Sequence, residues 1–528
     1  MDRLVRLSIS FLALRAALNG VNGEVSYSQS GLDWGGDCQS GEKQSPINIV
    51  MDEAVEVSEP EKFVLEYDTS ATTASIVNHG YTVQVVPNPE KTYKLHISKG
   101  TFILKQVHVH SFSEHAVNGL FAAMEAHFVH QHENDNTSLA VVGVMIRLQR
   151  HDEKSDWIDV WQSKVPAGVD TNTTIDVPEN FWTEMIDTSM GFWRYHGSLT
   201  SPACSEIVEW HVLRKAKFLS VSQAITFMNL IAKQNTERTD NRLPEPLNGR
   251  TVTSRISQLR LTMSPSATMA VVRLSLALLA LLAVVGAANA GSVSYSQSGL
   301  DWGGDCQSGE KQSPINIVMD EAVEVSEPEK FVLEYDSAAT TASVINKGST
   351  VQVAPNPDKT YKLHINSGTY NLLQMHVHAF SEHAVNGLFA PMEAHFVHVH
   401  ESDPYQLAVV GVMIRLQRHD EASAWIDTWL PKTPADVNGT ATIDIPDNFW
   451  AEMIDMSMGF WRYPGSLTTP DCNEIVEWHV VRKAKFLSVA QTITFMNMLA
   501  KQNTERTDNR LPEPVNGRTV TYYTTISS

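Results

Sequence analysis

The chain is one unit written twice. The segment that begins VSYSQSGLDWGGDCQS at Val25 recurs almost unchanged from Val293, and the same offset of 268 residues holds without a gap as far as Val252 and Val520. Solenoid repeats are about 20 to 50 residues long, so this period indicates two complete domains instead. Each copy is long enough to bury a core of its own.

Each copy is preceded by an apolar segment. Residues 269–290 contain one arginine, an apolar run from Leu274 to Ala288 and the small residues Ala-Asn-Ala, which is the layout of a signal peptide. A membrane helix needs about 20 apolar residues, so the run is short for a span. A cleavage site after Ala290, a retained anchor and a joined reading frame are the open alternatives.

These segments set the predicted domain boundaries. We predict a signal-like leader at 1–23, a first domain at 24–252, a polar linker at 253–268, an internal signal-like or anchor segment at 269–290, and a second domain at 291–528. The two signal-like segments predict a protein that is secreted or that resides in an extracellular space or an endomembrane lumen. Membrane contact is expected only if the internal segment is retained as an anchor.

Charge and cysteine content narrow the function classes. The 528 residues carry 40 basic and 60 acidic side chains, a net charge of −20, which argues against nucleic acid as a partner. Four cysteines are too few for a disulfide-dense miniprotein. Each copy has two of them: Cys38 and Cys204 in the first, and Cys306 and Cys472 in the second. One disulfide per domain is the simplest interpretation, and free buried thiols are the alternative.

Other patterns indicate a strand-rich, exported protein. Sequons at Asn136, Asn172 and Asn438 agree with a secreted glycoprotein. β-Branched, alternating segments predict a β-dominated α+β fold, in which each copy is a large sheet with short peripheral helices. The predicted strands are Ala74–Val86, Tyr93–Ile97, Phe102–His110, Met124–His132 and Leu139–Leu148. The predicted helices are Phe181–Ser189 and Val221–Gln234.

The histidines carry the chemistry. His108 and His110 lie two apart on a predicted strand, so their side chains share a face. His127 begins a strand that can pair with the first and can supply a third nitrogen. Three imidazoles with an open fourth position suit a catalytic zinc. The second copy repeats the set as His376, His378 and His395.

Acceptors for the second ring nitrogens accompany the histidines. Gln106 and Glu125 each stand two residues before a ligand and share its face, where a metal-binding histidine needs such a partner. Their counterparts are Gln374 and Glu393. Two alternatives remain: ordinary core histidines, and a cupin site, since His108-x-His110-x3-Glu114 matches the first cupin motif. Gly119 comes too early for the cupin spacing.

Five ordered motifs, each found twice, resemble the α-class carbonic anhydrases over nearly the whole of both copies. The first copy has Gln44-Ser-Pro-Ile-Asn48, Gln106-Val-His-Val-His110, Ser113-Glu-His115, Glu125-Ala-His127 and Gly197-Ser-Leu-Thr-Ser201. The second has Gln312-Ser-Pro-Ile-Asn316, Gln374-Met-His-Val-His378, Ser381-Glu-His383, Glu393-Ala-His395 and Gly465-Ser-Leu-Thr-Thr469. The cysteine pairs also look like the disulfide of the family's secreted members.

The resemblance implies a fold and an activity. The fold is a twisted, largely antiparallel ten-stranded sheet with zinc at the base of a conical cavity. The activity is the reversible hydration of carbon dioxide to bicarbonate and a proton by zinc-bound hydroxide, with one zinc in each domain and two per chain. The alternatives are a catalytically silent extracellular binding module of the same fold and a cupin-type metalloenzyme.

The resemblance also assigns roles to residues. Thr200 accepts the proton of the hydroxide and passes its own to Glu114, and the second copy has Thr468 and Glu382. An apolar wall for carbon dioxide is implied at Val129, Val141, Leu199 and Trp210, repeated as Val397, Val409, Leu467 and Trp478.

One position departs from the pattern. Family members with a proton-shuttle histidine have it where this chain has Tyr81 and Ser349. Tyrosine titrates near 10 and serine not usefully near neutral pH, so neither side chain suits proton transfer at pH 7. His79 is one position away, and strand alternation turns it to the other face. We therefore expect slow, buffer-dependent turnover in both domains, most of all in the second.

Overall fold

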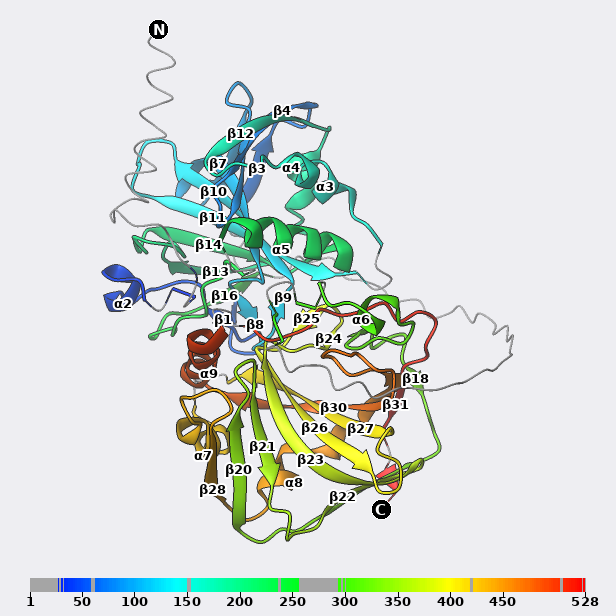
Figure 1. Cartoon of the computed structure of the whole chain (residues 1–528). Coiled ribbons are helices and arrows are strands. Elements are labelled where there is room, and N and C mark those ends of the chain that lie inside the picture. Colours follow the sequence, from blue (N-terminus) through cyan, green and yellow to red (C-terminus); the bar gives the residue numbers. More distant parts are fainter. Residues whose placement is uncertain are drawn as a thin grey trace.

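The computed structural model describes two β-rich copies (Figure 1). The described residues are 27, 30–31, 33–57, 62–149, 153–235, 239–255, 293–295, 298–299, 301–417, 421–503, 507–524 and 526–527. The predicted leader at 1–23 and the internal apolar segment at 269–290 lie outside them. Among the described residues, no helix is both long and apolar enough to cross a membrane.

The first copy consists of strands joined by short helices. Its helices are α2 (Asp37–Ser40), α3 (Asp156–Asp159), η1 (Gln162–Lys164), α4 (Phe181–Met185) and α5 (Val221–Asn235). Its strands are β1 (Asn48–Ile49), β2 (Val55–Glu56), β3 (Phe63–Tyr67), β4 (Thr72–Asn78), β5 (Val83–Pro87), β6 (Tyr93–Ile97), β7 (Gly100–Ser111), β8 (Ala116–Val117), β9 (Phe121–Ala122), β10 (Met124–His132), β11 (Leu139–Leu148), β12 (Thr171–Val177), β13 (Phe192–Gly197), β14 (Val208–Leu213), β15 (Lys217–Leu219) and β16 (Thr253–Arg255).

The second copy repeats this order. Its helices are α6 (Asp305–Ser308), α7 (Ala424–Trp429), η2 (Leu430–Lys432), α8 (Phe449–Met453), η3 (Met456–Met458) and α9 (Val489–Asn503). Its strands are β17 (Asn316–Ile317), β18 (Val323–Glu324), β19 (Glu329–Tyr335), β20 (Thr340–Asn346), β21 (Val351–Pro355), β22 (Tyr361–Ile365), β23 (Gly368–Ala379), β24 (Ala384–Val385), β25 (Leu388–Phe389), β26 (Met392–His400), β27 (Leu407–Leu416), β28 (Thr440–Ile445), β29 (Phe460–Gly465), β30 (Val476–Leu487), β31 (Thr521–Tyr523) and β32 (Ile526–Ser527).

Each copy is built on one large sheet. In the first, ten strands follow the path β12-β4-β5-β7-β10-β11-β14-β13-β16-β2, and β3, β6 and β15 attach beside it to make thirteen. Most pairs are antiparallel, but β11 runs parallel to β14 and β15, and β16 runs parallel to β2. The β-dominated fold is thus confirmed, with three more strands than the ten that the resemblance implies.

Local differences from the predicted elements have physical causes. The segment predicted as one strand, Ala74–Val86, is two: β4 ends at Asn78 and the chain turns through Gly80 (φ 82°) into β5. The helix predicted to end at Ser189 ends at Met185, because Asp187 Oδ1 accepts a hydrogen bond from the Ser189 backbone N–H in a local turn.

Other predictions agree with the structure. α5 begins with a reciprocal cap: the Gln223 N–H donates to Ser220 Oγ, and the Ser220 N–H donates to Gln223 Oε1. The predicted disulfides are present, Cys38 with Cys204 and Cys306 with Cys472, each with 5.0 Å between Cα atoms. The first three residues of the expected linker form β16, which pairs with β13 and β2, so the sheet of the first copy extends past Val252.

Candidate metal centre

Two neighbouring strands of each sheet bring three histidines together. β7 and β10 pair antiparallel with His108 opposite His127 and His110 opposite Glu125. Alternation along β7 turns His108 and His110 to one face, as predicted. In the second copy β23 and β26 repeat this register, with His376 opposite His395.

The three rings face a common point in both copies. Ring centroids are 4.9 Å apart for His108 and His110, 5.1 Å for His108 and His127, and 4.8 Å for His110 and His127. One ligand atom from each lies within 4.8 Å of the others. The corresponding ring distances in the second copy are 4.9, 5.2 and 4.8 Å for His376, His378 and His395. The structure thus forms both predicted histidine sets.

Polar contacts on the outer side orient each ring. His108 Nδ1 lies 2.9 Å from Gln106 Oε1, and His127 Nε2 lies 3.1 Å from Glu125 Oε1, as expected for these two acceptors. His110 Nδ1 bonds the backbone oxygen of Asp240 at 2.7 Å. The inner nitrogens, His108 Nε2, His110 Nε2 and His127 Nδ1, are therefore the atoms left for a metal.

The donor set fits zinc. His110 Nε2 and its counterpart His378 Nε2 are buried and have no hydrogen-bond partner among the described residues, although buried polar atoms are nearly always satisfied. His127 Nδ1 and His108 Nε2 approach to 3.3 Å. Three convergent imidazole nitrogens without a cysteine are the ligands of an open, catalytic zinc site.

The electrostatics favour neutral imidazoles. Burial lowers the pKa of His127 to about 4 and, together with the neighbouring histidines, holds the pKa of His108 well below its usual value. Burial alone would raise the pKa of Glu125, but His115 and His127 outweigh it and hold that pKa well below the ordinary range. Neutral imidazoles beside an ionised carboxylate are the protonation states that metal binding requires.

His115 and Asp240 join the site although sequence reasoning gave them no role. Glu125 accepts hydrogen bonds from the backbone N–H groups of Glu114 and His115 at 2.9 Å each, and its Oε1 lies 2.8 Å from His115 Nδ1. His115 belongs to the motif Ser113-Glu-His115, so the sequence did contain a signal for it. Asp240 lies 130 residues from His110 along the chain. The one signal for it in the sequence was that the second copy also has an aspartate, Asp508, at the same position.

Glu114 is fully buried beside the ligands. Its Oε2 lies 3.5 Å from His110 Nε2, and its Oε1 accepts a hydrogen bond from the Arg242 backbone N–H. Burial raises the pKa of Glu114 to about 8, and Thr200 is the next influence, which lowers it. Glu382 in the second copy is equally buried and accepts from the Arg510 N–H. The predicted pair Glu114 and Thr200 therefore lies together at the histidines.

The residues predicted to form an apolar wall lie in one hydrophobic cluster in each copy. Val129, Val141, Leu199 and Trp210 belong to one hydrophobic cluster, and the Trp210 ring lies 4.8 Å from that of His127. Val397, Val409, Leu467 and Trp478 form the matching cluster, with Trp478 at 4.8 Å from His395. A tryptophan ring of each cluster therefore lies against the histidine set in both copies.

In the first copy, the position at which related enzymes carry a shuttle histidine lies among aromatic side chains. Tyr81 packs against the cluster of Tyr27, Trp34 and the first disulfide. His79 lies beyond the end of β4, so strand alternation does not govern its direction. Its Nε2 lies 2.6 Å from Gln84 Oε1, and Gln84 is the register partner of His108. The argument that His79 turns away from the site is therefore wrong.

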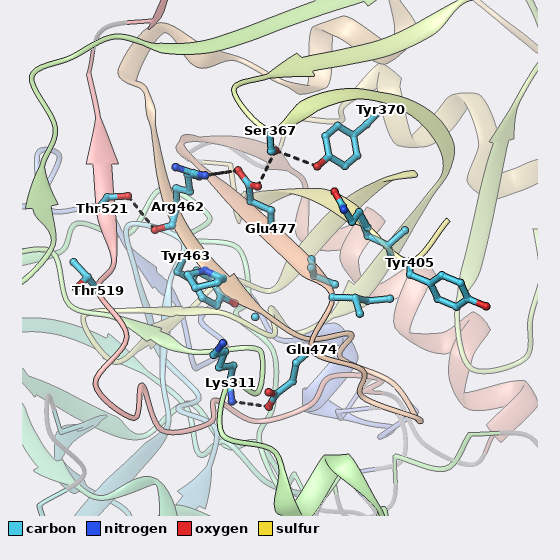
Figure 2. Close-up of a pocket in the computed structure, with 16 residues that line it drawn as sticks. Lys311, Ser367, Tyr370, Tyr405, Arg462, Tyr463, Glu474, Glu477, Thr519 and Thr521 are labelled. Atoms are coloured by element: carbon cyan, nitrogen blue, oxygen red, sulfur yellow. Dashed lines mark hydrogen bonds and ion pairs between the residues drawn. The ribbon is translucent and has the colours of Figure 1, made fainter. Parts of the chain in front are cut away.

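A separate cavity lies in the second copy (Figure 2). It has a volume of about 590 Å³ and is lined by side chains that include Ser367, Tyr370, Tyr405, Arg462 and Glu477. Arg462 and Glu477 are paired at 2.7 Å. None of the three histidines of that copy lines the cavity, so it is distinct from the candidate metal centre.

Comparison with known proteins gives consistent matches for both copies. A family model described as eukaryotic-type carbonic anhydrase matches residues 29–256 and 297–524. The chain is 31% identical to a carbonic anhydrase of Dunaliella salina over 95% of this chain and 89% of the relative, and 33% identical to one from Pectobacterium carotovorum over 41% and 81%. A solved α-carbonic anhydrase of Thermovibrio ammonificans with sulfanilamide matches at 29% identity, 41% and 89% coverage and a TM-score of 0.36.

Proposed function

The chain belongs to the eukaryotic-type carbonic anhydrase family, the enzymes of carbon dioxide hydration, and on this premise we propose that each copy is a separate zinc-dependent active site. His108, His110 and His127 hold the zinc of the first copy, and His376, His378 and His395 hold that of the second. Two zinc ions per chain follow.

A zinc ion held by these histidines would supply the nucleophile. In carbonic anhydrases, which are the standard example of this effect, zinc lowers the pKa of its bound water to about 7, so that hydroxide is available at neutral pH. The hydrogen bond of Gln106 to His108 and the close contact of Glu125 with His127 fix the ring orientations that would hold it. Gln374 and Glu393 do the same in the second copy.

Thr200 and Glu114 orient the attacking oxygen. Thr200 accepts a hydrogen bond from that oxygen and donates its own hydroxyl proton to Glu114, whose Oε1 is already engaged by the Arg242 N–H. An ionised carboxylate accepts this bond best. Burial outweighs the hydrogen bonds from Thr200 and Arg242 and raises the pKa of Glu114 to about 8, and a dication held by the nearby histidines would lower it again. Thr468 and Glu382 take these roles in the second copy.

The apolar wall receives the substrate. Carbon dioxide is small and uncharged, so a surface of Val129, Val141, Leu199 and Trp210 binds it without a charged partner. Bicarbonate is charged and polar, and the same surface favours its release. The reaction then has to release a proton to solvent, and the residues at 81 and 349 give slow, buffer-dependent transfer.

The two disulfides favour an oxidising compartment. Structural disulfides persist in secreted and lumenal proteins and are rare in the cytosol. We propose that the chain is secreted or lumenal, with residues 1–23 and 269–290 as leader-like segments. Analysis of the secreted product by mass spectrometry tests this proposal: cleavage after Ala290 yields two fragments, and a retained segment yields one chain.

One observation carries the proposal: three histidine nitrogens converge in each copy, and one of them is a buried atom that has no hydrogen-bond partner within the described part of the chain. The test replaces His127 and His395 with alanine, singly and together. Zinc content is expected to fall from two per chain to one and then to none, and each single variant is expected to retain the carbon dioxide hydration of the intact copy.

The control replaces His96 and His364, equivalent histidines bonded to Glu66 and Glu334 outside the site. These variants are expected to keep two zinc ions. Zinc without hydration would instead indicate a silent binding module, and iron or manganese in place of zinc would indicate a cupin-type metalloenzyme. Full activity in the double variant would contradict the assignment of the ligands.

A further inference from the structure

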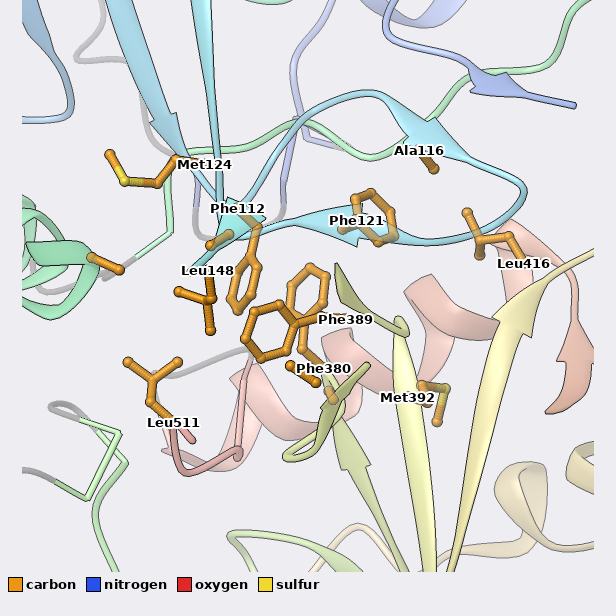
Figure 3. Packing of buried hydrophobic residues seen from close by; sticks show 14 of the residues in the cluster. Phe112, Ala116, Phe121, Met124, Leu148, Phe380, Phe389, Met392, Leu416 and Leu511 are labelled. Carbon is orange, nitrogen blue, oxygen red and sulfur yellow. The ribbon is translucent and has the colours of Figure 1, made fainter. Parts of the chain in front are cut away.

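Four phenylalanines from the two copies meet at one junction (Figure 3). Phe112 and Phe380 stack with ring centroids 4.0 Å apart and 18° between their planes. β9 pairs antiparallel with β25, which places Phe121 opposite Phe389. All four side chains are at most 2% exposed. The junction therefore joins the hydrophobic cores of the two copies into one cluster.

The contacts are reciprocal. Phe380 and Phe389 are the residues 268 positions after Phe112 and Phe121, so each phenylalanine meets its own counterpart. The cross contacts match as well: Phe112 meets Phe389 edge-on at 5.2 Å, and Phe121 meets Phe380 edge-on at 5.4 Å. A contact set in which i meets j′ and j meets i′ is that of a two-fold, isologous interface.

Glycines on both sides repeat this reciprocity. Gly119 has a φ of +74°, and a Cβ there would lie 2.6 Å from the backbone oxygen of Leu416. Gly387 has a φ of +71°, and a Cβ there would lie 2.5 Å from the backbone oxygen of Leu148. Each copy thus presents the same glycine turn to the same strand end of the other, at a distance that no larger residue permits.

Separation of the copies would expose this surface. Each phenylalanine buries about 150–250 Å² of surface, and monomeric proteins rarely expose apolar patches larger than a few hundred Å². The burial of these four side chains in a cluster shared by both copies therefore favours their staying together.

We propose that each copy carries a self-complementary surface, formed around Phe112, Gly119 and Phe121 and their counterparts, whose partner is a second copy of the same domain. The copies then stay paired when the connecting segment is cut, and a freed copy also pairs with another of its own kind. This proposal does not depend on the activity of either site.

The first experiment cuts the full-length chain at a specific protease sequence inserted within residues 256–290. A denaturing gel verifies complete cleavage, and light scattering measures the native mass. A single particle with the mass of the intact chain is expected at micromolar concentration. Two particles of about half that mass would overturn the proposal.

The second experiment uses the same cleavable chain with Phe112→Lys and Phe380→Lys. The dissociation constant between the halves is expected to rise by about 100-fold or more, since two buried aromatic anchors are lost. The matched control carries Phe218→Lys and Phe486→Lys, equivalent residues that are 39% and 40% exposed, and is expected to stay paired. Circular dichroism checks that each variant is folded, and Phe112→Ala with Phe380→Ala replaces the lysine pair if it is not.

The third experiment tests self-complementarity directly. Cleaved chains with an affinity tag on the first copy are incubated with cleaved, untagged chains whose first copy carries a different label. Capture of the labelled first copy on the tagged first copy is expected, because the surface accepts either copy. Capture of second copies alone would overturn this part of the proposal.

Discussion

The two copies agree around the histidines and differ at a segment that we call the rim. The rim is the turn between β4 and β5 in the first copy and between β20 and β21 in the second. The bonds from His110 and His378 to the backbone oxygens of Asp240 and Asp508 are 2.7 Å in each copy. At the rim, by contrast, His79 and Tyr81 are replaced by Lys347 and Ser349. The comparison indicates that the ligand geometry is set by strand register, whereas the rim varies without disturbing it.

A second difference between the copies lies away from the histidine sets and involves Glu209. In the first copy Lys99, Arg194 and His196 all contact this carboxylate. The second copy has Ser367 and Pro464 at the positions of Lys99 and His196, and there the 590 Å³ cavity lies beside Glu477. Loss of two long or cationic side chains therefore coincides with an opening on the second copy.

The largest expected effect concerns the disulfides, which should be equal in the two copies. Cys38→Ser with Cys204→Ser is expected to lower the free energy of unfolding by about 2–5 kcal/mol, because the bond closes a long loop. Cys306→Ser with Cys472→Ser removes a bond that closes a loop of the same sequence separation, so it should lower the free energy of unfolding by the same amount. Calorimetry measures both, and a loss confined to one copy would break the comparison.

The next effect concerns Glu125 and Glu393. Glu125→Gln removes the charge and replaces one acceptor oxygen with an amide, so the zinc affinity of the first copy is expected to fall by about 10- to 100-fold. Chelator competition measures it in chains whose other copy carries the His395→Ala change. Glu393→Gln beside His127→Ala is the matched experiment. A clear difference between the two losses would show that the ligand environments are not equivalent.

A smaller effect separates the rims. With His395→Ala and His127→Ala used to isolate the first and second copies, the hydration rate is expected to rise with imidazole concentration in both, by roughly tenfold or more in the second. Imidazole is a proton carrier near neutral pH, which Ser349 is not.

His79 sharpens this test. His79→Ala is expected to lower the low-buffer rate of the first copy toward that of the second and to leave the rate in saturating imidazole unchanged. Lys347→Ala is the matched control in the second copy and should change little. A rate independent of imidazole in either isolated copy would contradict slow proton transfer.

The smallest effect is a surface ion pair. Burial would raise the pKa of Asp187, but Lys215 and Ser189 outweigh it and lower that pKa to about 2. A lowered folded pKa stabilises above the unfolded value near 3.9, and this stabilisation is lost as the pH falls toward 2. Asp187→Asn is expected to cost about 0.5 kcal/mol at pH 7.

Urea unfolding at pH 7 and pH 3 measures this difference, which should shrink at the lower pH. Asp455→Asn removes the equivalent pair with Lys483, where hydrogen bonds from Lys483 and Ser457 lower the pKa of the aspartate further. An Asp187 effect that grows as the pH falls would contradict the assigned sign.

The predictable part of the site was local in sequence. Period-two alternation was enough to put His108 and His110 on one face, and β7 and β10 have nearly the bounds predicted. Asp240 was not predictable in this way, because its contact with His110 forms only when a distant segment packs under the sheet. The bend at Gly80 and the early end of α4 depend on turn chemistry, which propensity alone did not reveal.

The junction of the copies also has an evolutionary consequence. In a dimer of identical chains, one substitution at Phe112 alters both sides of the contact at once. Here Phe112 and Phe380 are encoded separately, so each side of the stacked pair can change while the other is kept. The tandem arrangement thus frees the interface from strict symmetry, and a substitution tolerated in only one half is the trace that such freedom leaves.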